Sequence, residues 1–187
     1  MSESIEVRSE ELTREDISYG LDYVRDAPKE VGTVELIVGR PAVDERIELA
    51  LAELDVERGL VVDRWSRGSK PNPRSQVTVM NARAAELVAR DRTRWALAGD
   101  QVYVDFDLSA GNIPAGTRLG LGSAVIEVSD QPHLGCEKFA ARYGQVAREF
   151  ANSPEGIALN FRGINTRVVQ SGFVRVGDAV RKIARQE

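Results

Sequence analysis

The only cysteine and the only histidine of the chain lie three residues apart, in the segment Gln131-Pro-His-Leu-Gly-Cys-Glu-Lys138. A helix is expected directly after Cys136, so the thiol would lie beside unpaired N–H groups and the positive end of the helix dipole. Lys138 adds a cation nearby. Both effects favour a thiolate, which is a nucleophile and a soft metal ligand.

Structural interpretations of the same two residues remain open. Cys136 precedes Phe139 by three residues and Tyr143 by seven, so it could extend the apolar face of the helix and be buried. His133 follows a proline, where a hydrogen-bonded loop role competes with a ligand role. One Cys and one His do not complete a tetrahedral zinc site, and closeness in sequence does not establish a Cys–His dyad.

Charged side chains supply two further candidates. The segment 66–75 contains prolines, serines and a glycine between apolar stretches, which is typical of a loop. Its cations, together with Arg64, could bind an anion, although the residue types alone favour a solvated loop. Asp105 and Asp107 lie two residues apart on an expected strand, which indicates a solvated strand face rather than an acid–base pair.

The elements that must position these residues are mainly strands. Helices are predicted from Thr13 to about Gly20, over 44–54, over 82–91 behind an Asn81 cap, over 136–151, and from Ser153-Pro154. Hairpins are predicted at Gly122-Ser123 and Ser171-Gly172. Period-two or β-branched segments predict strands over 31–39, 59–63, 76–80, 102–108, 117–122, 124–128, 166–170 and 173–176, followed by an apolar segment at 179–183. The pattern favours an α+β fold built on an antiparallel or mixed β-barrel with peripheral helices.

Composition limits the class of protein. The 187 residues are 42% hydrophobic, and 25 Lys and Arg against 29 Asp and Glu give a net charge of −4, which argues against nucleic acid as a partner. The sequence contains neither a stretch of about 20 apolar residues nor a signal peptide, so no membrane partner is expected. A single cysteine fits a reducing compartment. We therefore expect a cytoplasmic protein with an N-terminal extension over residues 1–30 and one domain over 31–187.

Three sequence blocks resemble the MOSC domain, which is named for the C-terminal part of molybdenum cofactor sulfurases. The likeness covers about residues 31–183 and is strongest to small, free-standing members. One position departs from the family pattern, because Val62 stands where glycine is frequent before the Asp-Arg pair. The blocks are Gly59-Leu-Val-Val-Asp-Arg-Trp65 with Arg74-Ser-Gln-Val-Thr-Val-Met-Asn81; Ala98-Gly-Asp100 through Asp107-Leu-Ser-Ala-Gly-Asn-Ile-Pro-Ala-Gly116 to Pro132-His-Leu-Gly-Cys-Glu-Lys138; and Arg162-Gly-Ile-Asn-Thr-Arg-Val-Val with Gly172-Phe-Val-Arg-Val-Gly-Asp178.

The resemblance implies a β-barrel and a role for Cys136 as a persulfide carrier or as a molybdenum ligand in the pyranopterin cofactor. It further implies that Arg64 meets the cofactor phosphate, that Asn112 meets the pterin edge, and that His133 and Lys138 flank the thiol. The implied partners are a molybdopterin-type cofactor or a sulfur donor protein, and the family is also associated with pyridoxal-phosphate proteins. Two alternatives are a molybdenum-dependent reductase of N-hydroxylated compounds and a non-catalytic protein with a structural cysteine.

Overall fold

The computed structural model describes residues 12–184. Seven strands close into a mixed barrel in the order β11-β7-β8-β9-β5-β6-β1, and β1 pairs with β11 to complete it. β5 and β6 run parallel, while the other neighbouring strands of the barrel run antiparallel. The predicted α+β barrel is confirmed. Its strands are β1 (Val31–Gly39), β5 (Val77–Asn81), β6 (Val102–Asp105), β7 (Arg118–Leu121), β8 (Ala124–Val128), β9 (Ile164–Gln170) and β11 (Ala179–Ile183).

A small second sheet lies against the barrel and consists of β10 (Gly172–Arg175), β3 (Leu51–Asp55) and β4 (Gly59–Leu60). The helix predicted over 44–54 is wrong, because this segment forms β3 and the short strand β2 (Ile47–Glu48), which pairs with β1. Ala52 and Leu54 point inward at a spacing of two, and this strand periodicity prevails because β10 pairs along β3.

One predicted hairpin forms and the other does not. Gly122-Ser123 connects β7 and β8, which pair antiparallel as predicted. The Ser171-Gly172 hairpin is wrong, because β9 belongs to the barrel and β10 pairs with β3. A Cβ atom on Gly172 would lie 2.5 Å from the backbone of Ser123, so glycine permits the close backbone approach with which the chain enters the small sheet.

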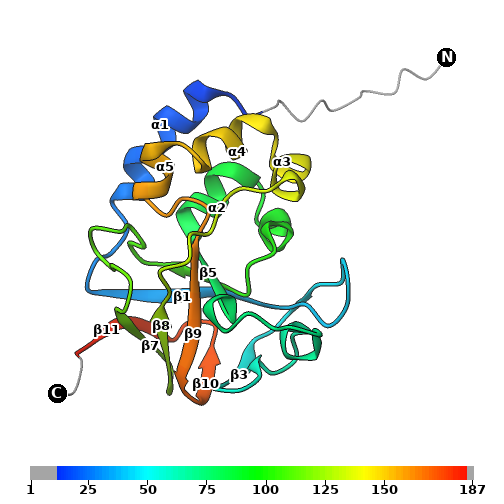
Figure 1. Ribbon diagram of the computed structural model, residues 1–187. Coiled ribbons are helices and arrows are strands. Elements are labelled where there is room, and N and C mark those ends of the chain that lie inside the picture. Colours follow the sequence, from blue (N-terminus) through cyan, green and yellow to red (C-terminus); the bar gives the residue numbers. More distant parts are fainter. Residues whose placement is uncertain (1–11, 185–187) are drawn as a thin grey trace.

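The helices form a layer on one side of the barrel (Figure 1). Thr13 caps α1 as predicted, but the helix continues past Gly20 to Arg25. The single helix predicted over 136–151 is interrupted at Gly144, because the φ angle of 92° at this residue is not helical. The helices are α1 (Arg14–Arg25), α2 (Ala82–Ala89), α3 (Glu137–Tyr143), α4 (Gln145–Ala151) and α5 (Pro154–Ala158), with 3₁₀ turns at Trp65–Arg67, Pro73–Ser75 and Arg92–Ala98.

Two hydrophobic clusters stabilise this arrangement. The first fills the barrel and includes Val34, Ile37 and Phe106. The second lies between the helices and the outer face of the barrel, where Leu36 and Tyr103 meet side chains of α1, α2 and α3. A register shift in β1 between Val34 and Leu36 lets this strand serve both clusters.

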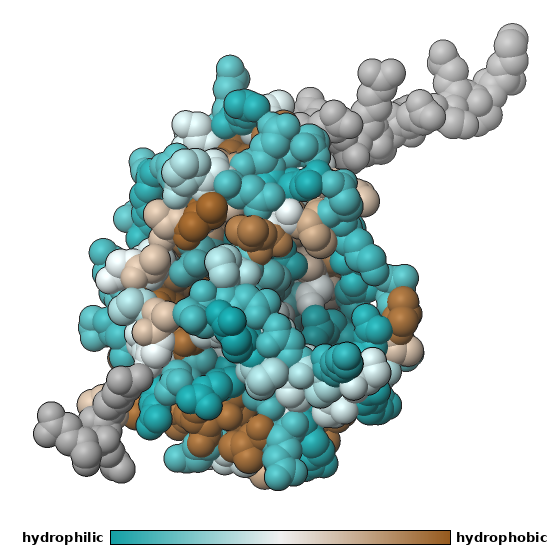
Figure 2. Space-filling model, in the orientation of Figure 1, coloured by the Kyte–Doolittle hydropathy of each residue, from teal (hydrophilic) through white to brown (hydrophobic). Residues whose placement is uncertain are grey.

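The outer surface is mostly hydrophilic in the orientation of Figure 2, apart from scattered apolar areas such as the one at the lower edge, over β10. Phe173 of β10 is 54% exposed. Within residues 12–184, no helix combines the length and hydrophobicity needed to span a bilayer.

Candidate functional site

Cys136 lies at the N-terminal boundary of α3 and is exposed to solvent. Its backbone carbonyl accepts the first hydrogen bonds of the helix, from Phe139 and Ala140. The side chain makes no capping hydrogen bond. The interpretation of Cys136 as a buried core side chain is therefore wrong: Phe139 and Tyr143 carry the buried face of α3, and Cys136 faces away from it.

The segment before Cys136 is held by two asparagines. Asn152 accepts a hydrogen bond from the backbone N–H of Gly135 at 2.8 Å and donates one to the Gly135 carbonyl at 2.9 Å. Asn165 donates to the carbonyls of Gln131 and Pro132, each at 3.2 Å. These bonds connect the segment to the end of α4 and to β9, so the thiol is attached to the rigid part of the fold.

Cys136 lines a pocket of about 170 Å³ whose walls come from four separate parts of the chain. Glu45 and Asp44 contribute acidic groups to one wall, and Ala42, Ala98 and Gly99 contribute backbone and small side chains. The basic side chains outnumber the acidic ones: they are Arg40, Arg46, Arg64, Lys138 and Arg142. In a chain with a net charge of −4, this pocket is a local concentration of positive charge that favours anionic ligands.

Two of these cations are fixed by other groups. Arg40 forms a bidentate ion pair with buried Asp63, with N–O distances of 2.7 and 3.2 Å, and donates to the Gly99 carbonyl at 2.7 Å. Arg142 donates to the Leu97 carbonyl at 2.6 Å. The carboxylate of Asp63 offsets the positive charge of Arg40. The guanidinium groups of Arg40 and Arg142 are both held in place on the pocket wall.

The other cations have unused hydrogen-bonding capacity. Among the side chains of residues 12–184, none forms an ion pair within 4.0 Å with Arg64 or Lys138. Arg46 donates to the Asp44 carbonyl at 3.2 Å, but its buried Nε has no partner in the described part of the chain. Burial, followed by repulsion from Arg142, lowers the pKa of Arg46. An anion in the pocket would relieve this repulsion.

His133 is partly buried and joins a polar cluster with the buried side chains of Asp100 and Arg162. Asp100 forms a short ion pair with Arg162, and His133 Nδ1 lies 3.5 Å from the second Asp100 oxygen. Burial, together with the nearby Arg162 charge, lowers the pKa of His133 to about 4, so this imidazole is neutral near pH 7. His133 does not line the pocket, but its partner Asp100 directly follows Gly99, which does.

The structure does not bring Asn112 to this pocket. Its amide nitrogen donates to the Asp107 carbonyl at 2.8 Å, and its oxygen accepts from Lys182 at 3.0 Å. Asn112 therefore joins the segment after β6 to β11. Val62 also lies outside the pocket lining, because its side chain covers Gly39, where an added Cβ atom would lie 2.7 Å away.

The basic loop contributes less to the site than its composition suggests. Arg67 donates to the Pro41 carbonyl at 2.7 Å, and Arg74 pairs with Asp130 at 2.6 Å. The expectation of a solvated strand face is wrong for Asp107, which lies beyond the end of β6, is buried and accepts a hydrogen bond from the Ser109 N–H. Asp105 pairs with Arg83 at 2.7 Å.

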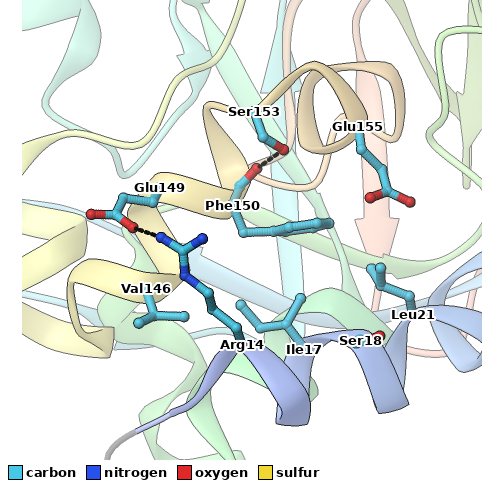
Figure 3. Close-up of a pocket in the computed structure, with 9 residues that line it drawn as sticks. All are labelled: Arg14, Ile17, Ser18, Leu21, Val146, Glu149, Phe150, Ser153 and Glu155. Carbon is cyan, nitrogen blue, oxygen red and sulfur yellow. Dashed lines mark hydrogen bonds and ion pairs between the residues drawn. The ribbon is translucent and has the colours of Figure 1, made fainter.

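A second pocket, between α1 and the α4–α5 segment, has a different chemistry (Figure 3). Ile17, Leu21 and Phe150 face one another across it, and Arg14 and Glu149 pair at its edge at 2.8 Å. Its volume is about 380 Å³, and its lining includes neither cysteine nor histidine. We therefore place the candidate site at the Cys136 pocket.

Sequence reasoning identified Cys136, Lys138 and Arg64 but missed the other three cations. Arg40 follows a strand, Arg46 lies in the segment mistaken for a helix, and Arg142 lies on α3. No local motif connects these positions, because only the tertiary structure brings them together. Over residues 12–184, no group of three or more His, Cys, Asp and Glu side chains is placed to hold a metal ion.

Solved structures share this architecture. YuaD from Bacillus subtilis is similar with a TM-score of 0.55 and 17% identity, covering 83% of this chain and 97% of YuaD. YiiM from Escherichia coli has a TM-score of 0.55 and 19% identity, covering 83% and 71% of the two chains. YiiM from Geobacillus stearothermophilus has a TM-score of 0.53 and 16% identity, covering 83% and 76%. No curated protein matches the chain. The family model of the MOSC domain matches residues 71–181, more than half of the chain, and the protein therefore belongs to the MOSC family.

Proposed function

We propose that the Cys136 pocket binds the anionic end of a pyranopterin molybdenum cofactor, or carries sulfur for that cofactor as a persulfide on Cys136. The observation that supports this proposal is the exposed thiol on the wall of a pocket with five basic side chains. A thiolate binds soft metals, and guanidinium groups bind phosphate through charge-assisted hydrogen bonds. The two kinds of group that such a cofactor needs therefore occur in one pocket.

The size of the pocket agrees with partial enclosure of the cofactor. Its volume of about 170 Å³ is below the roughly 300–1,000 Å³ of pockets that bury most of a drug-sized ligand. The pocket would therefore hold the phosphate end of the cofactor and the part that lies next to the Cys136 thiol. The remainder of a pyranopterin would extend over the rim.

The residues of the chain have separable tasks in this proposal. Arg64 and Lys138 would bind the phosphate, because their charges are not neutralised by ion pairs in the described part of the protein. Cys136 would supply one metal ligand or the sulfur-carrying thiol. Molybdenum, when bound, supplies redox chemistry. Neutral His133 supports the segment that carries Cys136 without adding a positive charge.

The test is to purify the protein from cells that make the cofactor and to measure molybdenum by mass spectrometry and persulfide by intact mass. We expect stoichiometric molybdenum or one additional sulfur atom on the wild type, and neither on Cys136→Ser. Arg64→Gln should reduce cofactor retention about tenfold, because it removes a charge-assisted hydrogen bond.

Lys70→Gln is the matched control, because Lys70 is an exposed cation outside the pocket lining. It should retain the wild-type load. Cys136→Ser should also unfold at the wild-type temperature, since substitution of an exposed side chain changes stability little. Wild-type protein that carries neither molybdenum nor extra sulfur, with a thiol that iodoacetamide alkylates slowly, would overturn the proposal.

A further inference from the structure

The Cys136 pocket has the charge and the volume to hold a small anionic ligand. Its lining carries five basic and two acidic side chains. Buried Asp63 neutralises one of the basic groups, Arg40, which leaves a surplus of two positive charges. A surplus of this size matches a small dianion.

The donors in the pocket are also arranged for several oxygen acceptors. Arg40 and Arg142 are held by backbone carbonyls and cannot move far. Arg64 and Lys138 are exposed, and buried Arg46 Nε lacks a partner within the described residues. The guanidinium and ammonium groups of Arg64 and Lys138 are therefore available to the oxygens of an anion.

The volume of the pocket is sufficient for a small anion. A pocket of about 170 Å³ equals roughly six water volumes at about 30 Å³ each. This space accommodates a tetrahedral oxyanion and a few waters, with the exposed sulfur of Cys136 as part of the wall. The reactive thiol would thus meet any anion bound there.

We propose that this pocket takes a small oxyanion that carries a transferable sulfur atom, with thiosulfate as the simplest representative, and that Cys136 accepts that sulfur. The inference rests on the sulfur-carrying half of the proposed function and names the class of the sulfur donor. A donor of this class would load Cys136 without a protein partner.

The transfer balances without an added oxidant or reductant. The Cys136 thiol loses its proton to solvent, and the resulting thiolate attacks the outer sulfur of thiosulfate. A new S–S bond forms on Cys136, the S–S bond of thiosulfate breaks, and its electron pair leaves with sulfite. Positive charge from Arg64 and Lys138 stabilises the sulfite as it forms, and Cys136 is left as a persulfide.

The experiment incubates purified full-length protein with thiosulfate and measures sulfite release together with the intact mass. We expect one sulfite per chain, one additional sulfur atom on the protein, and thiocyanate after addition of cyanide. Cys136→Ser should show none of these. Sulfate should compete with loading, whereas chloride at the same ionic strength should compete less, because it lacks the oxygen acceptors.

The variants test the role of the pocket cations. Arg64→Gln and Lys138→Gln should each raise the thiosulfate concentration for half-maximal loading about tenfold, since each removes a charged hydrogen-bond donor. Their effect on loading from an uncharged alkyl persulfide should be several times smaller. Lys70→Gln, which removes the same charge outside the pocket lining, should behave as the wild type with thiosulfate.

The outcomes separate this inference from the function on which it rests. Loading from the alkyl persulfide but not from thiosulfate would overturn the oxyanion donor and leave the sulfur-carrier proposal standing. Loading from thiosulfate that is equal in wild type and Arg64→Gln and Lys138→Gln would also overturn it. Failure of both donors, without molybdenum on protein from cofactor-producing cells, would overturn both proposals.

Discussion

The basic residues of the candidate site differ in whether an ion pair already neutralises their charge. Asp63 neutralises the charge of Arg40, and Asp130 neutralises that of Arg74 in the loop 66–75. Arg64 and Lys138 have no such ion pair within the described chain. Their charge is therefore available to a ligand. For this reason the pocket beside Cys136 is a stronger indication of a binding site than the cations of the loop 66–75.

His133 provides the pH-dependent prediction at this scale. Its pKa is held at about 4 by burial and Arg162, whereas an unfolded histidine has a pKa of about 6.5. The unfolded chain therefore binds more protons between these values, and the free energy of unfolding should fall as pH decreases through that window. Complete protonation corresponds to a loss of about 3 kcal/mol.

Denaturation of the wild type and His133→Asn at several pH values between 7 and about 4 measures this effect, because the variant should lose that part of the pH dependence. His133 is the only histidine, so proton NMR of its ring gives the pKa without assignment. A ring that titrates near its unfolded value, with parallel pH profiles for both proteins, would contradict the buried cluster.

Elements of the fold are set by backbone geometry at particular positions. Gly144 separates α3 from α4 with φ 92° and ψ 160°, a conformation open almost only to glycine. No atom lies within 4 Å of a Cβ built there, so steric contact is not an issue. Gly144→Ala should therefore reduce the free energy of unfolding by roughly 1–3 kcal/mol through backbone strain alone.

Gly111→Ala is the matched control, because a Cβ at Gly111 also meets no atom within 4 Å and its φ is not positive. Chemical denaturation of both variants separates strain from the general effect of a methyl group. Equal stability of the two alanine variants would show that Gly144 relaxes without cost, and α3 and α4 would then merge readily into one helix.

At the scale of the molecule, the N-terminal helix belongs to the shared helical core. Ile17, Leu21 and Val24 of α1 are buried and join side chains of α2 and Phe139 of α3 in one cluster. Residues 14–25 thus cover part of the barrel rather than extending away from it, although the polar composition of this region resembles that of a peripheral segment.

Leu21→Ala tests this packing and should reduce the free energy of unfolding by about 2–5 kcal/mol, because it leaves a cavity among buried side chains. Tyr19→Ala on the same helix should change it by less than about 0.5 kcal/mol, since Tyr19 is 94% exposed. Thermal or urea unfolding distinguishes the two. A Leu21→Ala protein as stable as the wild type would mean that α1 does not contribute to the core.

Features that depend on neighbouring residues could be predicted from the sequence. Alternating apolar residues indicated the barrel strands, and Thr13, Asn81 and Ser153 indicated helix starts, where the structure shows their side chains accepting backbone N–H bonds. Local patterns succeed here because side-chain alternation and capping need only a few consecutive residues. Of the site residues suggested by the family resemblance, Arg64, Cys136 and Lys138 line one pocket, whereas His133 and Asn112 lie outside its lining.

The sequence did not predict which distant segments of the chain contact one another. In the structure, a segment with helical spacing forms β3, and β10 pairs with β3 instead of β9. Cys136 is exposed and lines the same pocket as Arg40, Arg46 and Arg142. Strand pairing, burial and local charge depend on contacts between residues far apart in the chain, and these contacts override weak local preference. A pocket assembled from four segments leaves no continuous pattern in the sequence, because its chemistry exists only after the barrel has closed.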